Sequence, residues 1–201
     1  MSPPDPLDAD RLRAATADQH IGREIVILQQ ATSTNDVVAD MAPTSAEGLV
    51  VFAEQQTAGR GQYGRRWESA AGKGLWLSIL LRPRLSVSDS ARLTDFLAAA
   101  IAATIQEQIG VRATIKPPND VYVADRKVAG VLVEMRVEPS GSYCAIAGLG
   151  INVNQAPEDF PPELSGRAGS LAEAAGEPIN RSNLAIALLR KLDKDYAAAE
   201  L

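Results

Sequence analysis

The sequence predicts an α+β fold in which helices pack on a mixed, mainly antiparallel sheet. Strand-like runs outnumber helical ones, and four of them follow one another between residues 112 and 153. The segment 88–110 is the clearest helix. Strands that follow one another without intervening helices favour this class over a doubly wound fold, in which strands and helices alternate.

The first half of the chain contains one short expected helix among its strands. Residues 32–35 (T-S-T-N) offer N-cap side chains directly before an apolar stretch at 37–41, which indicates a helix start. Apolar and β-branched runs predict strands at 24–29, 48–54 and 74–81.

Residues 1–23 differ in composition from the rest of the chain. The segment is polar and begins with a stretch rich in Pro and Asp, so we expect a loose leader with at most one short helix near 10–18. The remaining residues, 24–201, are expected to form one domain, because 201 residues suit a single hydrophobic core.

The helix at 88–110 has both a start and a stop signal. Ser88 or Ser90 can cap it, and Gly110 can end it. Apolar residues recur at helical spacing: Leu93, Phe96, Leu97, Ala100, Ile101, Ile105 and Ile109.

The second half continues with strands, a proline-rich loop and two helices. A polar turn at 124–127 indicates a hairpin, and three prolines mark 155–167 as a loop. The expected strands are 112–116, 121–124, 128–137 and 143–153, and the expected helices are 170–175 and 181–199.

Composition excludes several classes of protein. Twenty Lys and Arg against twenty-five Asp and Glu give a net charge of −5, opposite to a generic nucleic-acid or membrane-surface binder. With Cys144 and His20 as the only cysteine and histidine, neither an intramolecular disulfide nor a Cys- or His-built metal centre can form. No secretory signal or membrane-spanning apolar run is present, so we expect a cytoplasmic protein.

The segment 57–67 (T-A-G-R-G-Q-Y-G-R-R-W) is the most informative stretch. Gly59, Gly61 and Gly64 formally match G-x-G-x-x-G, but no apolar helical period follows, so a dinucleotide fold is disfavoured. Glycines expose backbone N–H groups, and arginines suit phosphate oxygens. The two interpretations are an anion site and a solvated basic loop, and three arginines in an acidic protein favour the first.

Two further segments carry candidate residues. In K-P-P-N-D at 116–120, the prolines restrict the backbone beside Lys116, which could neutralise charge on a transferring group or be an ordinary surface lysine. In G-L-G-I-N-V-N at 148–154, Asn152 and Asn154 would face one side of a strand. Its glycines indicate close approach of a ligand, or a sheet edge that needs small residues.

Taken in order, these segments resemble the catalytic domain of biotin–protein ligases. Residues 33–35 match the family's S-T-N segment, and 55–67 its glycine and arginine loop. Residues 116–120 are similar to its K-W-P-N-D box, 127–134 to its K-x-x-G-x-L-x-E strand, and 148–154 to its G-x-G-I-N-x-N strand. The resemblance implies the class II aminoacyl-tRNA synthetase-like fold that biotin and lipoyl ligases share.

The resemblance also implies a two-step reaction. The biotin carboxylate attacks the α-phosphate of ATP to give biotinyl-5′-AMP, and a lysine on the biotinyl domain of a biotin-dependent carboxylase then attacks this anhydride. ATP with Mg²⁺ is the implied cofactor, with the metal held mainly by phosphates and no metal site built from protein residues. The expected partners exclude DNA and membranes, and a homodimer is left open.

Site residues carry over by their positions in these motifs. The implied catalytic residues are Lys116 and Arg60, with Lys116 contacting the biotin carboxylate and the α-phosphate. The implied ATP and adenylate residues are Arg65, Trp67, Asn119 and Asn152, with Trp67 packing on the base. The implied biotin-binding residues are Ser33, Thr34, Asn35, Gln56, Arg60, Gly61, Gln62, Lys116, Gly130, Gly148 and Gly150.

Three departures from the family pattern affect these expectations. Gln62 stands where the family often has arginine, which leaves retention of the adenylate to Arg60 and Arg65. Pro117 replaces the tryptophan of the K-W-P-N-D box. We expect the SH3-like C-terminal domain of many members to be absent, and the N-terminal segment is too short for a DNA-binding domain.

Two alternative functions remain open. A lipoate-type acyl ligase shares the fold, but its double-Arg, triple-Gly and His-Asp segment is not found here. A non-catalytic biotin or nucleotide sensor would bind the same ligands without turnover, against which the arginine loop and Lys116 argue.

Overall fold

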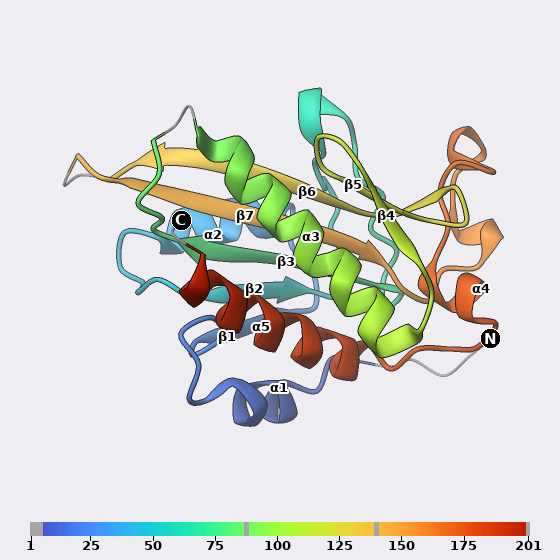
Figure 1. Cartoon of the computed structure of the whole chain (residues 1–201), viewed down its shortest axis with the longest axis horizontal. Coiled ribbons are helices and arrows are strands. Elements are labelled where there is room, and N and C mark those ends of the chain that lie inside the picture. The colour runs from blue at the N-terminus through green and yellow to red at the C-terminus, as the bar shows by residue number, and fades with distance from the viewer. Residues whose placement is uncertain (1–5, 87–88, 139–140, 200–201) are drawn as a thin grey trace.

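Seven strands form one mixed sheet, on which the helices pack (Figure 1). The computed structural model describes residues 6–86, 89–138 and 141–199. The strand order is β1-β2-β3-β7-β6-β5-β4. Strands β1 and β2 are parallel, and the other neighbouring pairs in the described chain are antiparallel. The predicted α+β class with a mainly antiparallel sheet is confirmed.

The elements lie close to their predicted positions. The strands are β1 (Ile25–Leu28), β2 (Val50–Ala53), β3 (Gly74–Leu81), β4 (Ala113–Lys116), β5 (Asp120–Val123), β6 (Arg126–Val137) and β7 (Tyr143–Asn152). The α-helices are α1 (Ala9–Thr16), α2 (Thr34–Met41), α3 (Ser90–Ile109), α4 (Leu171–Ala175) and α5 (Arg181–Ala198). Short 3-10 turns are η1 (Gln62–Gly64), η3 (Pro157–Asp159) and η4 (Pro162–Leu164).

Local sequence signals explain where the helices begin and end. Gly110 ends α3 in the left-handed region with φ 76°, as glycine allows. The side chain of Ser170 accepts a hydrogen bond from the Glu173 N–H at the start of α4, and Asn180 caps α5 in the same way. Ser88, one of the two predicted caps of α3, lies outside the described residues.

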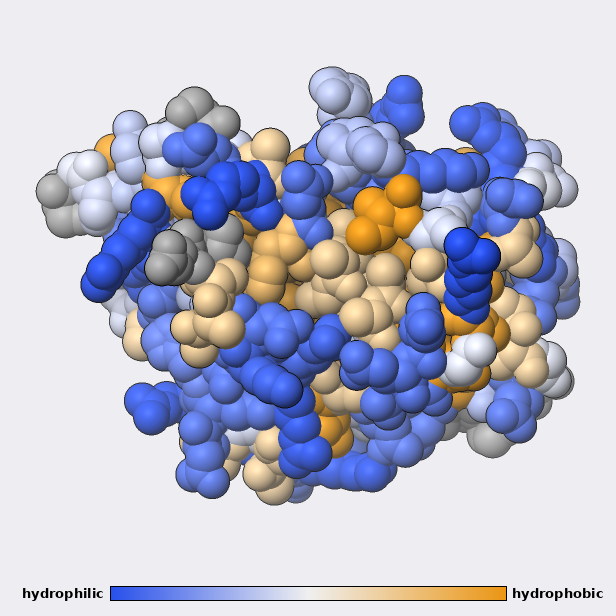
Figure 2. Space-filling model, viewed as in Figure 1, coloured by the Kyte–Doolittle hydropathy of each residue, from blue (hydrophilic) through white to orange (hydrophobic). Residues whose placement is uncertain are grey.

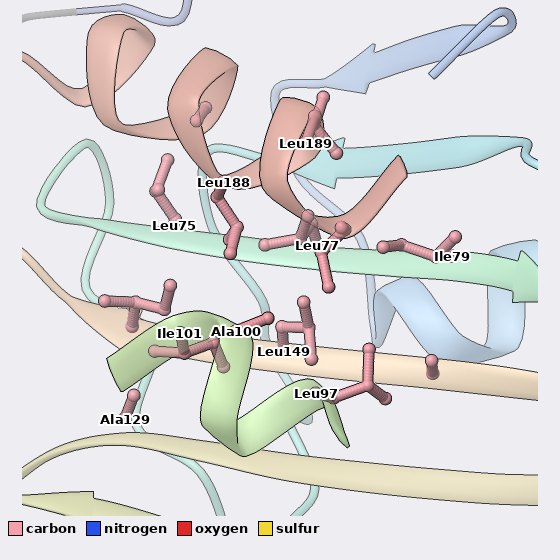
Figure 3. Close-up of a cluster of buried hydrophobic side chains, with 14 of the residues drawn as sticks. Leu75, Leu77, Ile79, Leu97, Ala100, Ile101, Ala129, Leu149, Leu188 and Leu189 are labelled. Atoms are coloured by element: carbon pink, nitrogen blue, oxygen red, sulfur yellow. The ribbon is translucent and has the colours of Figure 1, made fainter. Parts of the chain in front are cut away.

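The main core lies between the sheet and helices α3 and α5 (Figure 3). Side chains alternate along β3, so Leu75, Leu77 and Ile79 face these helices. Figure 3 shows Leu97 of α3 and Leu188 of α5 among them. A smaller core under α2 covers part of the opposite face and contains Val38, Ala42, Leu49, Val51, Leu80, Cys144 and Ile146.

The N-terminal segment is not loose where it is described. Leu7, Leu12 and Ile21 are buried in the main core, although the residues around them are polar. Helix α1 lies beside α5 in Figure 1. The expectation of a loose leader failed because three well-spaced apolar side chains suffice to anchor a short polar segment.

A buried ion pair joins distant parts of the chain. The guanidinium of Arg181 lies 2.8 Å from the Glu54 carboxylate and also donates to the Gly74 carbonyl. The other Glu54 oxygen accepts from the Leu7 N–H. The start of α5, the end of β2, the start of β3 and the N-terminal segment therefore meet at one carboxylate.

The helical face is mostly hydrophilic over α1 and α5, with a weakly apolar area over α3 (Figure 2). Within the part of the chain that the structure describes, no helix is both long and apolar enough to span a bilayer.

Truncating one core side chain tests this packing. Leu97 is 1% exposed, so Leu97→Ala is expected to lower the free energy of unfolding by about 2–5 kcal/mol. The exposed Asp95 on the same helix provides the control, because Asp95→Ala should change it by less than about 0.5 kcal/mol. Urea denaturation measures both, and equal effects would contradict the assignment of α3 to the core.

Candidate functional site

A cavity of about 680 Å³ lies on the sheet face opposite α3 and α5. This volume is typical of a small-molecule site. Strands β5, β6 and β7 form its floor, and its walls come from the start of α2, the loop 57–67 and the segment 160–168.

All predicted site residues except Lys116 line this cavity. They come from distant segments that the sheet brings together: Ser33, Thr34, Asn35, Gln56, Arg60, Gly61, Gln62, Arg65, Trp67, Asn119, Gly130, Gly148, Gly150 and Asn152.

Glycines on β6 and β7 leave the floor without side chains. Gly130 and Gly150 are directly paired across the two strands. A Cβ at Gly150 would lie 2.5 Å from Cε2 of Trp67, and one at Gly148 would lie 2.3 Å from Oδ1 of Asn35. Both side chains can therefore rest on the sheet backbone. The sheet-edge interpretation fails, because β7 lies between β3 and β6.

One end of the cavity carries a network of amides and hydroxyls, which we call the polar end (Thr34, Asn35, Gln56 and Ser78). The Gln56 Oε1 accepts from the Thr34 backbone N–H at 2.8 Å and from its hydroxyl at 3.1 Å. The Ser78 hydroxyl lies 2.7 Å from Thr34 Oγ1 and 2.6 Å from Asn35 Oδ1. Gln56 is held from its other side, since its Nε2 donates to Ser69.

The orientation of the Asn35 amide is fixed by its two partners. Its Nδ2 donates to Glu134 Oε2 at 2.6 Å, and its Oδ1 faces Ser78. A carboxylate accepts only, so the nitrogen must point toward Glu134. Asn35 is 3% exposed, and a flip of its amide would place an oxygen against the Glu134 carboxylate and lose that hydrogen bond.

The loop 57–67 folds back on itself over the cavity. Trp67 N donates to Gly59 O and Gly61 N donates to Arg65 O, with the turn η1 at the tip. Figure 1 shows η1 projecting beyond the sheet at the top of the view. Tyr63 at this tip adopts φ 58° and is 86% exposed.

The guanidinium of Arg60 binds carboxylates. Its two terminal nitrogens lie 2.8 and 2.7 Å from the two oxygens of Asp36, a bidentate pair, and Nη2 lies 3.5 Å from Glu134 Oε2. The hydrogen bond from Arg60 is the main reason that the pKa of Asp36 lies below its usual value. The same hydrogen bond raises the pKa of Arg60.

Trp67 lies across the middle of the floor. Its ring meets Trp76 edge to face, with centroids 6.4 Å apart. Its Nε1 is buried and has no hydrogen-bond partner among the described residues. A Cβ at Gly150 would lie 2.6 Å from this nitrogen, so the N–H is turned toward the sheet backbone.

Two lysines lie at different places relative to the cavity. Lys116 is exposed at the end of β4, its ammonium lies 3.8 Å from the ring centroid of Tyr122, and it is not among the cavity-lining residues. Lys127 lines the cavity, and its ammonium lies 2.6 Å from Asp120 Oδ1. The two prolines after Lys116 lie in the turn between β4 and β5, but the lysine that lines the cavity comes from β6.

Asn119 and Asn152 hold the backbone around the cavity. Asn119 Nδ2 donates to the Val131 carbonyl. Asn152 Nδ2 donates to the Gly169 carbonyl at 3.1 Å, and its Oδ1 accepts from Gln155. Asn154, expected beside Asn152, instead pairs with the backbone of Ile179. The Nδ2 groups of Asn119 and Asn152 are therefore engaged by backbone carbonyls.

The segment 167–169 forms a bridge with the start of β6. Lys127 N donates to Arg167 O, and Gly169 N donates to Lys127 O. We call Lys127 and Arg167 the cationic end of the cavity. It lies further along β7 than the polar end, since the Lys127 ammonium is beside Gly130, which pairs with Gly150, whereas Asn35 lies against Gly148.

Two arginines of the lining have no acidic partner among the described residues. Arg65 and Arg167 make no ion pair there, whereas Arg66 lies 3.0 Å from Glu68. The acidic residues of the lining are Glu68 and Asp120, and both already face a cation. No cluster of three His, Cys, Asp or Glu side chains suited to a metal occurs in residues 6–86, 89–138 and 141–199.

Sequence reasoning missed several residues of this site. Ser78 could have been found from strand alternation, since it lies between two core-facing residues of β3. Lys127 and Glu134 were inside a recognised motif without an assigned role. Nothing in the sequence indicated Asp36 or Arg167.

Comparisons with known proteins agree with this geometry. The model of the biotin/lipoate A/B protein ligase family matches residues 26–152. The bifunctional ligase/repressor BirA of Bacillus subtilis is 37% identical over 96% of this chain and 60% of its own length. The biotin–[acetyl-CoA-carboxylase] ligase of Mycobacterium tuberculosis is 34% identical over 92% of this chain and 73% of its own length.

A solved structure shares the fold. Biotin protein ligase from Aquifex aeolicus in complex with biotin and ATP matches with a TM-score of 0.77 and 30% identity, covering 87% of this chain and 71% of that one. The chain spans only 60% of the Bacillus relative. On the extent of these matches, the chain belongs to the biotin/lipoate A/B protein ligase family.

Proposed function

We propose that this chain activates biotin with ATP as biotinyl-5′-AMP and transfers the biotinyl group to a lysine of a biotin carboxyl carrier protein. The observation that carries the proposal is one cavity that has a neutral hydrogen-bonding end and a cationic end. A ligand with a polar ring at one end and a carboxylate at the other fits this arrangement.

The polar end suits the ureido ring of biotin. That ring has two N–H donors and one carbonyl acceptor in a plane. Gln56 and Thr34 offer amide and hydroxyl groups that can donate or accept, and Asn35 is held in one orientation. The buried Ser78 hydroxyl contacts Thr34 and Asn35 and so supports this arrangement. The bare backbone beside them leaves room for a ring against the sheet.

The cationic end suits the first chemical step. A carboxylate oxygen of biotin forms a bond to the α-phosphorus of ATP, and the bond from that phosphorus to the bridging oxygen breaks, so pyrophosphate leaves with the electron pair. Negative charge grows on the departing oxygens. Lys127, Arg65 and Arg167 line the cavity as cations and would stabilise that charge.

We assign to Lys127 the role first expected of Lys116. Its ammonium faces the cavity and is held by Asp120, so it is oriented before a ligand binds. The face of Trp67 offers a surface for the adenine base. Arg60 is already bound by two carboxylates, which supports a role in holding the loop over the ligands.

The second step needs no protein nucleophile. The amine of the carrier lysine attacks the carbonyl carbon of the anhydride, the carbon–oxygen bond to the phosphate breaks, and AMP leaves with that oxygen while the amine loses a proton. Among the described residues, the cavity lining contains no histidine or cysteine, and the mechanism requires neither.

The donor set fits magnesium carried by ATP. Glu68 and Asp120 are each paired with a cation, so the described lining offers no carboxylate cage, and the phosphates would supply most ligands of the ion. The bound ion would neutralise phosphate charge.

Labelling of a carrier tests the proposal. The purified chain with biotin, ATP and Mg²⁺ is expected to release pyrophosphate and to add one biotinyl mass to a biotinyl domain, measured by mass spectrometry. Omitting ATP is the control. Tight biotin binding without pyrophosphate release would indicate a sensor, and labelling with lipoate in place of biotin would indicate the other branch of the family.

A pair of lysine substitutions tests the mechanism. Lys127→Ala is expected to slow single-turnover adenylate formation by about 10²–10³-fold, because it removes a preorganised charge. Lys116→Ala is the matched control and should leave the rate within about threefold, as expected for an exposed surface position. The opposite ranking would return the role to Lys116.

A further inference from the structure

We propose that Asp36 and Glu134 are positioning residues that hold the loop 57–67 over the cavity by binding the guanidinium of Arg60. The inference deepens the proposed function, because it assigns the part of the machinery that retains the reactive adenylate. Neither carboxylate is among the lining residues of the cavity, so both act through Arg60.

The guanidinium of Arg60 contacts one carboxylate on each of two sides. The two terminal nitrogens of Arg60 face the two oxygens of Asp36 at 2.8 and 2.7 Å, and the nitrogen nearer Glu134 lies 3.5 Å from its Oε2. The planar guanidinium matches a carboxylate in this way, whereas a lysine could not. We call this arrangement the carboxylate clasp (Asp36, Glu134 and Arg60).

The clasp is the distal anchor of the loop. The base of the loop is held by backbone hydrogen bonds that Thr57 and Ala58 donate to the carbonyls of residues 31 and 32. Among the described residues, Arg60 alone connects the stretch 60–65 to anything outside the loop by a hydrogen bond or ion pair. Without the clasp, the hydrogen bonds of that stretch described in the structure would all lie within the loop.

The charge balance supports a mechanical role for Arg60. One guanidinium faces two carboxylates, so the clasp carries a net charge of −1 and contributes no positive potential to a phosphate. The hydrogen bond from Arg60 lowers the pKa of Asp36, which keeps the carboxylate ionised. The side chains of Arg60 and Asp36 are 36% and 42% exposed, so water can compete with the pair and the loop can open.

Glu134 connects the clasp to the polar end of the cavity. Its Oε2 accepts from Asn35 Nδ2 at 2.6 Å and also faces Arg60. Asn35 directly precedes Asp36 at the start of α2. A ligand that engages the Asn35 amide therefore acts on a group that shares a carboxylate oxygen with the loop anchor, which links occupancy of the polar end to closure.

Hydrogen exchange of the ligand-free protein tests the clasp without any activity. Asp36→Asn and Glu134→Gln are expected to speed exchange in a peptide spanning 57–67 by about five- to tenfold for Asp36 and less for Glu134, since a charged bidentate contact becomes a weaker neutral one. Asp40→Asn is the matched control, because Asp40 is exposed on the same helix. Unchanged exchange in both clasp variants would overturn the proposal.

A charge-exchanged double variant and separate measurements of KM and kcat complete the test. The double variant Asp36→Arg with Arg60→Asp should recover at least half of the lost protection from exchange. If the two single substitutions acted only by damaging the local structure, their losses of protection would instead add in the double variant.

In the ligase assay, Asp36→Asn should raise the KM for biotin and the fraction of free biotinyl-5′-AMP severalfold while kcat stays within about threefold. A fall in kcat with an unchanged KM and no free intermediate would contradict the positioning role. Loss of protection in a chain without ligase activity would support the clasp and refute the proposed function.

Discussion

Bare backbone at the centre of the sheet is the constraint on which the site depends. At Gly130, Gly148 and Gly150 two paired strands present no side chains to the cavity, and the space is taken by Asn35 and Trp67. Any larger residue at Gly148 or Gly150 would meet these groups at less than 3 Å. The opposite face of the same strands is apolar and buried under α3 and α5. One face of β7 therefore contributes to the stability of the fold, and the other forms the floor of the cavity.

Charge is distributed within the cavity in a way that the net charge of the chain does not reveal. The protein is acidic overall, yet Arg65, Lys127 and Arg167 face one space. The acidic residues nearest to it are occupied in ion pairs, so they orient cations rather than repel an anion. An anionic ligand would meet fixed positive charge in a partly enclosed volume, where such contacts are stronger than in water.

Most of the fold could be predicted from the sequence, because its helices and strands have a recognisable spacing of apolar residues. The segment 74–81 became β3 without change, and α3 ends at the predicted Gly110. The packing of residues 7–21 could not be predicted, since single apolar side chains in a polar segment show no period. A tertiary arrangement decides which of them are buried.

The candidate site was predictable as a set of segments and less so as a set of side chains. Motif order brought all but one of the expected residues to the cavity. The sequence did not indicate that Lys127 lines the cavity and Lys116 does not, because the direction of a side chain at a strand end depends on the pairing of β4, β5 and β6. Asp36 and Glu134 meet Arg60 across 24 and 74 residues of sequence, a juxtaposition that only the folded sheet creates.

The ion pair between Lys127 and Asp120 affects which anions can bind in the cavity. The ammonium already has a carboxylate at 2.6 Å, so an incoming anion must outcompete or share that partner. A lone carboxylate offers no more charge than Asp120 does. A polyphosphate offers several negative oxygens to the same ammonium and to Arg167 beside it, so its charge density, more than its shape, would favour its admission.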